Sequence, residues 1–345
     1  MRSTHGVGMV SGTTVSRAAR LLEQHAGVLH GAQVQQLETM GEAGIGMLAA
    51  GIRGATGPIE VELFGLCHAG VIDALAGAAN RGVPVRVLAD PELVANQARE
   101  VLIPAGVKFT SYGESAADAI AGRPWDIARN PRKVHAKFVT WDDGTKGWMS
   151  TASLFRLHDS IDVSALVGPE TARHMAELTR VGQTDSRQAI VAAAADAARD
   201  GVVLNDPVHG VHHLTDAYES LITGAEHELV IAFKRVTDPK LARLIDEAAQ
   251  RGVKVHLLTH ESKMAKRAVR ELDHVTVTSD PAGMLHANVI IADGSVAAFG
   301  SAHATERALG HKAKRLSREA GVVVDDAQHV SHLRDTVLEL IAAAS

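Results

Sequence analysis

Apolar and polar positions alternate from residue 59 and then change to helical spacing. Alternation over 59–63 predicts a strand, because alternate side chains share one face of a sheet. Helical spacing follows over 69–80, Arg81-Gly82 provides a stop signal, and the apolar run 83–88 predicts the next strand. The pattern therefore predicts a β-α-β unit.

The same order of elements returns in the second part of the chain. A strand is predicted over 229–233, a helix over 240–250 and a second strand over 253–258, with Arg251-Gly252 between the last two. The tripeptide Arg-Gly-Val after the helix is the same in both copies, at 81–83 and at 251–253. This recurrence predicts an internal duplication.

The residues before the first unit have a different pattern. Helical spacing from Ser16 to Gly54 predicts two helices with a break near 27–31. They form either an arm for recognition or homodimerisation, or a layer packed against the first domain. We favour packing, because no turn typical of a DNA-binding helix pair is present. We predict a helical arm over 1–57 and two domains over 58–185 and 186–345.

Polar residues cluster where the next strand of each copy begins. His135, Lys137 and Asp142 occur within eight residues, and alternation places His135 and Lys137 on one face of a strand. The second copy has His286, Asn288 and Asp293. The spacing of 151 residues between the two histidines also separates the two aspartates, and separates Ser150 from Ser301.

The pattern H-x-K-x4-D-x6-G-S-x-N resembles the phospholipase D superfamily in its two-motif form. The first copy reads Met149-Ser150-Thr151-Ala152 at the G-S-x-N position, and the second reads Gly300-Ser301-Ala302-His303. The second copy also has Asn288 in place of lysine. The resemblance implies an α/β fold of two similar α/β/α-sandwich halves related by a pseudo-twofold axis, here with an N-terminal helical segment.

The resemblance also implies roles for the motif residues. His135 would be the nucleophile and His286 the general acid, so that a phosphohistidine forms and is then discharged. Lys137 would hold a phosphoryl oxygen with help from Asn288, Ser150 and Ser301. The acids Asp162 and Glu319, each on a later strand, would orient the histidines. Asp142 and Asp293 complete the two catalytic motifs, and in this family they more often brace the fold than contact substrate.

The two departures in the second motif bear on the charge available to a phosphoryl group. Asn288 supplies no charge, so stabilisation of the transition state weakens unless His303 or a nearby basic residue compensates. A protonated His303 would bind a phosphoryl oxygen, whereas a neutral one would only fill space. Two basic stretches, 263–270 and 311–315, and a long segment over 90–132 could also face the cleft or lie on the surface.

Composition limits the classes of function. The net charge of −5 argues against a wholly basic nucleic-acid-binding surface, and 3% aromatic residues leave few rings for base stacking. No export signal or membrane span is evident, and the single cysteine suits a reducing compartment, so we expect a cytoplasmic protein. The expected substrate contains a phosphodiester, in a lipid, a small molecule or a nucleic acid. We expect no metal and no cofactor.

Three functions fit these observations. The first is a metal-independent phosphodiesterase or a phosphoryl- or phosphatidyl-transfer enzyme. The second is a degenerate module that binds phosphate groups or a nucleic-acid backbone without turnover. The third is an enzyme of altered chemistry that uses the same two histidines. We favour the first, because a binding cleft has no need of both histidines.

Overall fold

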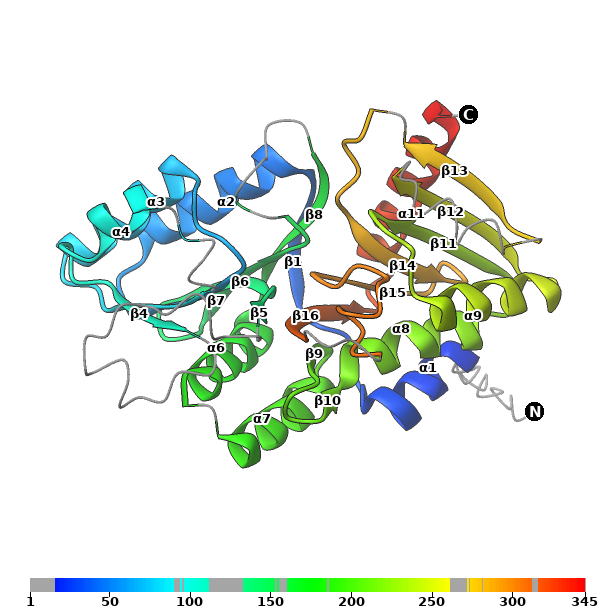
Figure 1. The fold of residues 1–345 in the computed structure, drawn as a ribbon, viewed down its shortest axis with the longest axis horizontal. Helices are drawn as coiled ribbons and strands as arrows, with labels where there is room; N and C mark the ends of the chain where they lie inside the picture. Colours follow the sequence, from blue (N-terminus) through cyan, green and yellow to red (C-terminus); the bar gives the residue numbers. More distant parts are fainter. Residues whose placement is uncertain are drawn as a thin grey trace, which may run out of the picture.

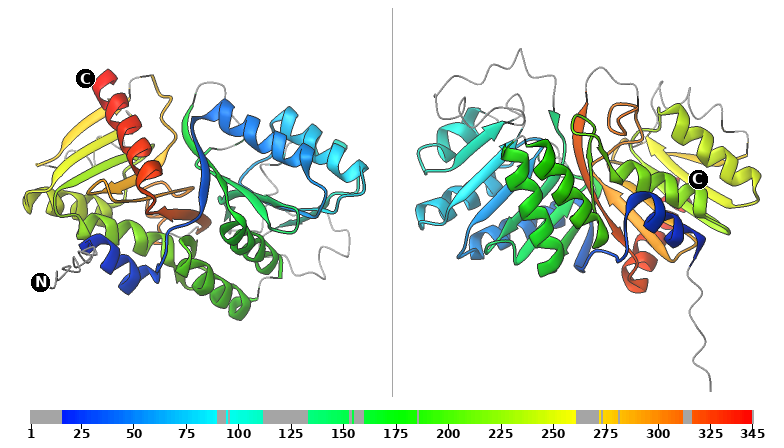
Figure 2. Two further views of the ribbon diagram at one scale, coloured as in Figure 1. Left: turned by 180° about the vertical axis from the view of Figure 1, so that it is seen from behind. Right: turned by 90° about the horizontal axis from the view of Figure 1, so that it is seen from below.

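The chain folds into two α/β halves that lie side by side (Figure 1). Each half is built on one sheet with helices on both of its faces, as the views in Figure 2 show. The computed structural model describes residues 16–89, 94, 96–111, 133–152, 154, 160–184, 186–260, 272, 274–280, 282–311 and 316–344. The two predicted basic stretches and the segment before the first motif lie wholly or largely outside these residues.

The first sheet has the strand order β1-β8-β7-β6-β2-β3-β4. Strands β2, β3 and β4 are parallel, while β6, β7 and β8 form an antiparallel meander beside β2. The strands are β1 (Val34–Met40), β2 (Ile59–Leu63), β3 (Val85–Ala89), β4 (Lys108–Ser111), β6 (Lys137–Trp141), β7 (Lys146–Ser150) and β8 (Ile161–Val167).

The second sheet repeats this topology. Its order is β10-β9-β16-β15-β14-β11-β12-β13, so that from β9 onward each strand has a counterpart in the first sheet. The strands are β9 (Val202–Asp206), β10 (Val211–His212), β11 (Glu228–Phe233), β12 (Lys254–His260), β13 (Thr276–Asp280), β14 (Asn288–Ala292), β15 (Val296–Gly300) and β16 (Ser317–Val324). The short strand β5 (Lys133–Val134) crosses from the first half to pair with β16.

Helices cover both faces of each sheet (Figure 1). On the outer side of the first sheet, helices α2 and α3 pack against each other over one apolar core, and α8 and α9 do the same in the second half. The core on the other side is continuous from one half to the other and includes α6, α7 and α11. The helices are α1 (Arg17–Leu21), the π-helix η1 (Leu22–Ala26), α2 (Gly41–Gly54), α3 (Ala69–Asn80), α4 (Asn96–Leu102), α6 (Pro169–Thr184), α7 (Arg187–Arg199), α8 (His213–Gly224), α9 (Pro239–Gln250) and α11 (Ala327–Ala344).

The N-terminal region differs from the prediction in two ways. Helical spacing was correct for residues 17–26 and 41–54, but Val34–Met40 forms the edge strand β1, paired antiparallel with β8. Pairing with an open sheet edge outweighs the weak helical pattern of this stretch. The first helical segment packs against α8 of the second half, whereas we expected it on the first domain. With β1 and α2 equivalent to β9 and α8, the repeat extends upstream to Val34.

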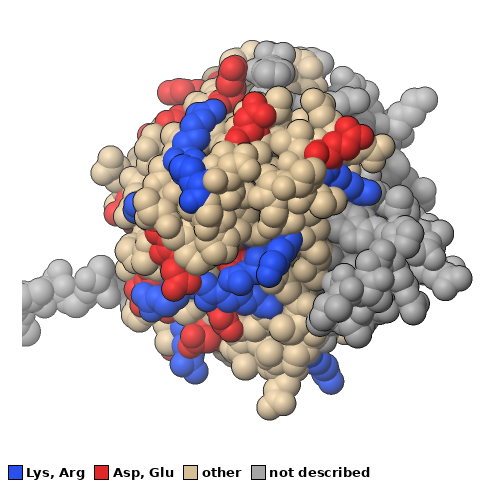
Figure 3. All heavy atoms as spheres, turned by 90° about the vertical axis from the view of Figure 1, so that its left-hand side faces the viewer, with Lys and Arg blue, Asp and Glu red and all other residues tan. Residues whose placement is uncertain are grey.

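Charge on the outer end of the first half is mixed. Figure 3 shows Lys and Arg side chains in a short band with Asp and Glu beside it, and most of the described surface of this face is uncharged. A continuous basic surface of the kind that follows a nucleic-acid backbone is absent from this described face. None of the described helices is long and apolar enough to cross a bilayer.

Candidate active site at the junction of the two halves

Each motif histidine is anchored by a strand of the opposite half. The backbone N–H groups of His135 and of the next residue both donate to the carbonyl of Arg318 on β16, at 2.8 and 3.0 Å. The backbone N–H groups of His286 and Ala287 both donate to the carbonyl of Ile161 on β8, at 2.9 and 2.8 Å. The two halves therefore meet in a pseudo-symmetric way at the histidines themselves.

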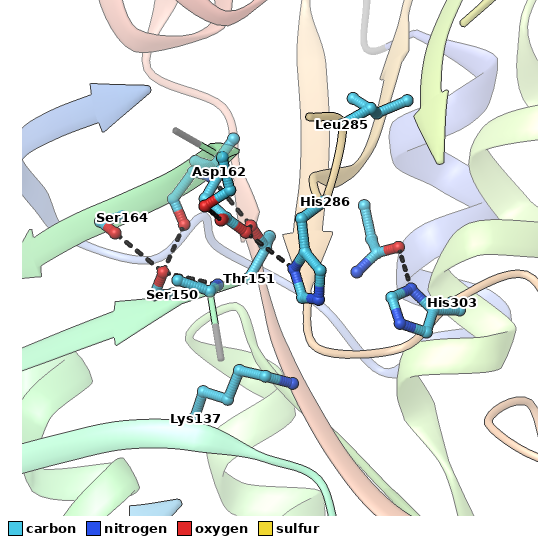
Figure 4. Close-up of polar contacts among 12 residues, drawn as sticks. Lys137, Ser150, Thr151, Asp162, Ser164, Leu285, His286 and His303 are labelled. Carbon is cyan, nitrogen blue, oxygen red and sulfur yellow. Dashed lines mark hydrogen bonds and ion pairs between the residues drawn. The ribbon is translucent and has the colours of Figure 1, made fainter. Parts of the chain in front are cut away.

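The orienting acids follow the same crossed arrangement. His135 Nδ1 lies 2.7 Å from Glu319 Oε2. His286 Nδ1 lies 2.9 Å from Asp162 Oδ1, as Figure 4 shows. Because an ionised carboxylate only accepts hydrogen bonds, each Nδ1 carries the proton and donates it. Each histidine therefore keeps Nε2 as the nitrogen available for chemistry, and its acid comes from the other half of the chain.

Hydroxyl groups hold Asp162 in place. Thr151 Oγ1 donates to Asp162 Oδ1 at 2.8 Å, and Ser160 Oγ donates to Oδ2 at 2.6 Å. Burial alone would raise the pKa of Asp162, but His286 and the two hydroxyls together lower it. Asp162 is therefore ionised at neutral pH and faces His286 as an anion.

Glu319 has an equivalent environment. Ser317 Oγ donates to Glu319 Oε1 at 2.7 Å. Ser301 Oγ donates to Glu319 Oε2, which also accepts the hydrogen bond from His135 Nδ1. Burial would raise the pKa of Glu319, but His135, Lys137 and Ser301 lower it below its ordinary value. Both acids are thus buried carboxylates whose charge is stabilised by specific donors.

Both motif histidines are held in the neutral state. Burial lowers the pKa of His135 to about 4, with a smaller contribution from Lys137, although Glu319 opposes the shift. Burial also lowers the pKa of His286, against the opposing effect of Asp162. A neutral imidazole with an unprotonated Nε2 is the form required of a nucleophile.

Lys137 brings a cation close to His135. Its side chain is 1% exposed, and Nζ donates to the carbonyl of His135 at 2.8 Å while lying 3.3 and 3.4 Å from the two ring nitrogens. Nζ also lies 5.6 Å from the ring centroid of Phe64, which packs edge-on against His135 at 4.3 Å. Burial lowers the pKa of Lys137 to about 8, so the ammonium is charged at neutral pH.

His303 occupies the position between the two motif histidines. Its ring centroid lies 5.5 Å from that of His135 and 5.5 Å from that of His286. The His135 and His286 rings are therefore no further apart than twice that distance. His303 Nδ1 donates to Asn288 Oδ1 at 2.7 Å (Figure 4), while Asn288 Nδ2 donates to Gly300.

The charge of His303 follows from these neighbours. Burial, and after it the two motif histidines, Lys137 and Lys234, lower the pKa of His303 well below its ordinary value. His303 is therefore neutral in this structure, which disagrees with its being a resident cation for a phosphoryl oxygen. Its ring is hydrogen-bonded and placed between the reacting groups, so it does more than fill space.

The two motif serines are enclosed in the fold. Ser150 is fully buried and bonds to the Val163 carbonyl and the Ser164 hydroxyl, and Ser301 is fully buried against Glu319. The structure therefore does not bring either hydroxyl to the position we expected beside a phosphoryl oxygen. Ser301 instead supports the acid of His135, and Ser150 ties β7 to β8.

The motif aspartates lie away from the histidines and brace the fold. Asp142 and Asp293 each follow the strand that the motif histidine precedes, both with positive φ, at 55° and 52°. Asp142 accepts backbone N–H groups of Thr56 and Gly57 at 2.8 and 2.9 Å, and Asp293 accepts three successive N–H groups over 226–228. A five-residue strand separates each aspartate from its motif histidine, which agrees with a bracing role, and their catalytic role stays a prediction.

Several site residues escaped the sequence analysis. Thr151, Ser160 and Ser317 carry no motif signal of their own, although two of them lie two residues before an orienting acid. Phe64 and Lys234 directly follow the first strand of each β-α-β unit, where a comparison of the two copies could have found them. Within the described ranges, no three His, Cys, Asp or Glu side chains are grouped so as to hold a metal ion.

Comparisons with known proteins agree with this architecture. Residues 218–341 match the family model described as "Cardiolipin synthase, PLD-like domain". No curated protein matches the chain. Among solved structures, a phosphatidylserine synthase from Haemophilus influenzae Rd KW20 is similar with a TM-score of 0.64 and 14% identity, covering 95% of this chain and 91% of that one.

A second similar structure is larger than this protein. The polyphosphate kinase from Porphyromonas gingivalis has a TM-score of 0.60 and 14% identity, and the match covers 86% of this chain but only 44% of the kinase. The phospholipase D-like fold thus extends over most of the chain, and the matched domain lies in its second half. Residues 218–341 therefore match a PLD-like domain, and the fold of most of the chain is similar to that of the phosphatidylserine synthase.

Proposed function

We propose that the protein is a phosphodiesterase or a phosphoryl- or phosphatidyl-transfer enzyme that works through a phosphohistidine on His135. The observation that carries the proposal is the crossed pairing of two neutral histidines with two buried carboxylates on either side of His303. Such pairs fix the tautomer and leave each Nε2 without the acid as a partner, with the His303 ring between the two histidines. The match of residues 218–341 to a PLD-like domain supports phosphoryl transfer as the general chemistry.

The reaction follows as two displacements at one phosphorus atom. The reactive form is the one in which His135 is neutral and His286 carries a second proton, on Nε2. Nε2 of His135 attacks phosphorus, the bond to the leaving oxygen breaks, and that oxygen takes the Nε2 proton of His286. His286, now neutral, takes a proton from water or an alcohol, whose oxygen attacks phosphorus and breaks the P–N bond. We assign the nucleophile to His135, because Lys137 lies beside its ring and its pKa of about 4 keeps it neutral at neutral pH.

Charge stabilisation comes from the protein's own cation. Lys137 Nζ lies within 3.4 Å of both ring nitrogens of His135, so a phosphoryl group attached there meets an ammonium. Glu319 stabilises the positive charge that the ring acquires when Nε2 bonds to phosphorus. Because these groups supply the charge, we expect turnover without an added divalent ion.

The test uses a chromogenic bis-aryl phosphodiester in EDTA. We expect turnover by the unaltered protein and none by His135→Ala, while His332→Ala, an exposed histidine on α11, behaves as the unaltered protein. His286→Ala should accumulate an acid-labile phosphoryl adduct on His135, detected by mass spectrometry, because discharge then lacks its base. Salt-sensitive binding of nucleic acid without turnover would instead favour a binding module, and turnover only of other substrate classes would favour altered chemistry.

A further inference from the structure

The second motif has no lysine at the position that Lys137 occupies in the first motif. Asn288 occupies the position of Lys137, and its side chain is fully buried and held between the Gly300 carbonyl and His303. His303 is neutral for the reasons given above. Neither residue therefore supplies positive charge to a phosphoryl group bound near His286.

Strand pairing places another lysine beside this gap. Leu63 on β2 pairs with Lys137, and Phe233 on β11 pairs with Asn288, in the same antiparallel arrangement. The residues that follow, Phe64 and Lys234, therefore occupy equivalent positions in the two halves. The first half has an aromatic ring there, and the second half has a lysine.

The first half shows which way this position faces. The ring of Phe64 packs 4.3 Å from the ring of His135, so a side chain at this position lies against the motif histidine. In the second half, the backbone N–H of Lys234 donates to the carbonyl of Ala287 at 3.1 Å, directly between His286 and Asn288. The backbone of Lys234 is thus bonded to the second motif, and its side chain is half-buried.

We propose that Lys234 supplies the cation for the phosphoryl group that the second motif lacks at Asn288. This inference rests on the proposed phosphoryl chemistry of the cleft and extends it to a residue outside both motifs. A phosphoryl oxygen near His135 would meet Lys137, and one near His286 would meet Lys234. The site therefore binds an oxyanion from both halves although only one motif lysine is present.

The electrostatics of the neighbouring groups agree with this placement. After burial, the charge of Lys234 is among the causes that lower the pKa of His286, of His303 and of Lys137. Among the described residues, the carboxylates beside the two motif histidines are Asp162 and Glu319, and each contacts its histidine. The Lys234 ammonium therefore acts electrostatically on three members of the site, in agreement with the strand register that places it beside the second motif.

The experiment measures binding of inorganic phosphate by calorimetry and the histidine pKa values by NMR titration. Lys234→Gln should weaken phosphate binding by about tenfold or more, the loss expected for one charge-assisted contact, and should raise the pKa of His286. The control is Lys254→Gln, the same change at an exposed lysine on β12 whose charge acts on His256. It should leave both quantities unchanged.

Two results would overturn the inference: equal phosphate affinity in the two variants, or a pKa of His286 that does not move in Lys234→Gln. Neither measurement requires turnover. Phosphate binding that depends on Lys234 in a protein without phosphodiesterase activity would therefore refute the proposed function and leave this inference intact.

Discussion

Replacing Glu319 by glutamine removes the charge behind His135 and preserves the shape of the side chain. The amide can keep the contacts with the Ser301 and Ser317 hydroxyls, so the fold should be little affected. The attack step should slow, because Nε2 of His135 bonds to phosphorus while Nδ1 keeps its proton, and the ring becomes cationic. In the variant no carboxylate stabilises that charge.

The size of the effect follows from the geometry of the pair. The Nδ1 to Oε2 distance is 2.7 Å and the Glu319 side chain is 2% exposed, so solvent screens the interaction only weakly. A hydrogen bond to a charged group contributes about 1.5–3 kcal/mol. At 1.36 kcal/mol per tenfold in rate, the attack step should slow by about 10- to 150-fold.

The assay separates the two displacements. With enzyme in excess over a bis-aryl phosphodiester, release of the first aryl alcohol reports attack by His135, because an aryl oxygen departs without a proton. Steady-state turnover also includes discharge of the phosphohistidine, in which His286 acts as the base. Glu319→Gln should slow the single-turnover phase, whereas the matched variant Asp162→Asn should leave it unchanged and slow the steady state.

The crossed arrangement is refuted if the two variants slow both phases to the same extent. It is also refuted if Glu319→Gln leaves the single-turnover rate unchanged. Thermal unfolding of both variants controls for loss of folded protein. Because the two acids have equivalent contacts, a difference between the variants can only come from the histidine that each acid serves.

Three further predictions concern pH and stability. For a substrate with an alkyl leaving group, kcat/KM should be greatest on the acidic side of neutrality. The neutral nucleophile His135 is lost only as pH falls through about 4, whereas the protonated form of His286, whose pKa is lowered, is lost as pH rises. A maximum above pH 8, where Lys137 also loses its charge, would contradict this. Arg318→Met should lower the free energy of unfolding, measured in urea, by about 3–5 kcal/mol, because the buried carboxylates of Glu62 and Asp206 lose their cation. A change below about 1 kcal/mol would contradict this prediction. Asp142→Asn should lower the free energy of unfolding at neutral pH by about 1–3 kcal/mol and leave kcat unchanged. The pKa of this carboxylate is about 2 in the fold, so the stability that it contributes is lost only as pH falls toward that value. A large fall in kcat would support a catalytic role for Asp142.

Local patterns were sufficient to predict much of the fold. The β-α-β units and the strands that carry His135 and His286 were visible because apolar alternation and the Arg-Gly stop signals are properties of a few adjacent residues. The strand at Val34–Met40 could not be predicted in this way, since only its pairing with β8 distinguishes it from a helix of similar spacing. Local sequence does not indicate which edge of a sheet is free to pair.

The same limit applies to the candidate site. Asp162 and Glu319 were recognisable as acids on the strand after each motif, but their assignment to His286 and His135 depends on how the halves pack. The burial that makes His303 neutral is also a property of the packed site. Lys234 lacks a motif, and its place became clear only from the strand register.

The crossed contacts have a consequence for how the site can form. Each half supplies one histidine and the acid of the other, and the backbone of each histidine is tied to the strand that bears its acid. Neither half can therefore orient its own imidazole, even when its sheet is complete. Lys137 and Lys234 follow the same logic, because one phosphoryl group would need a cation from each side. The duplication thus produces a single site at the junction, whose two halves have diverged in where they carry their lysine.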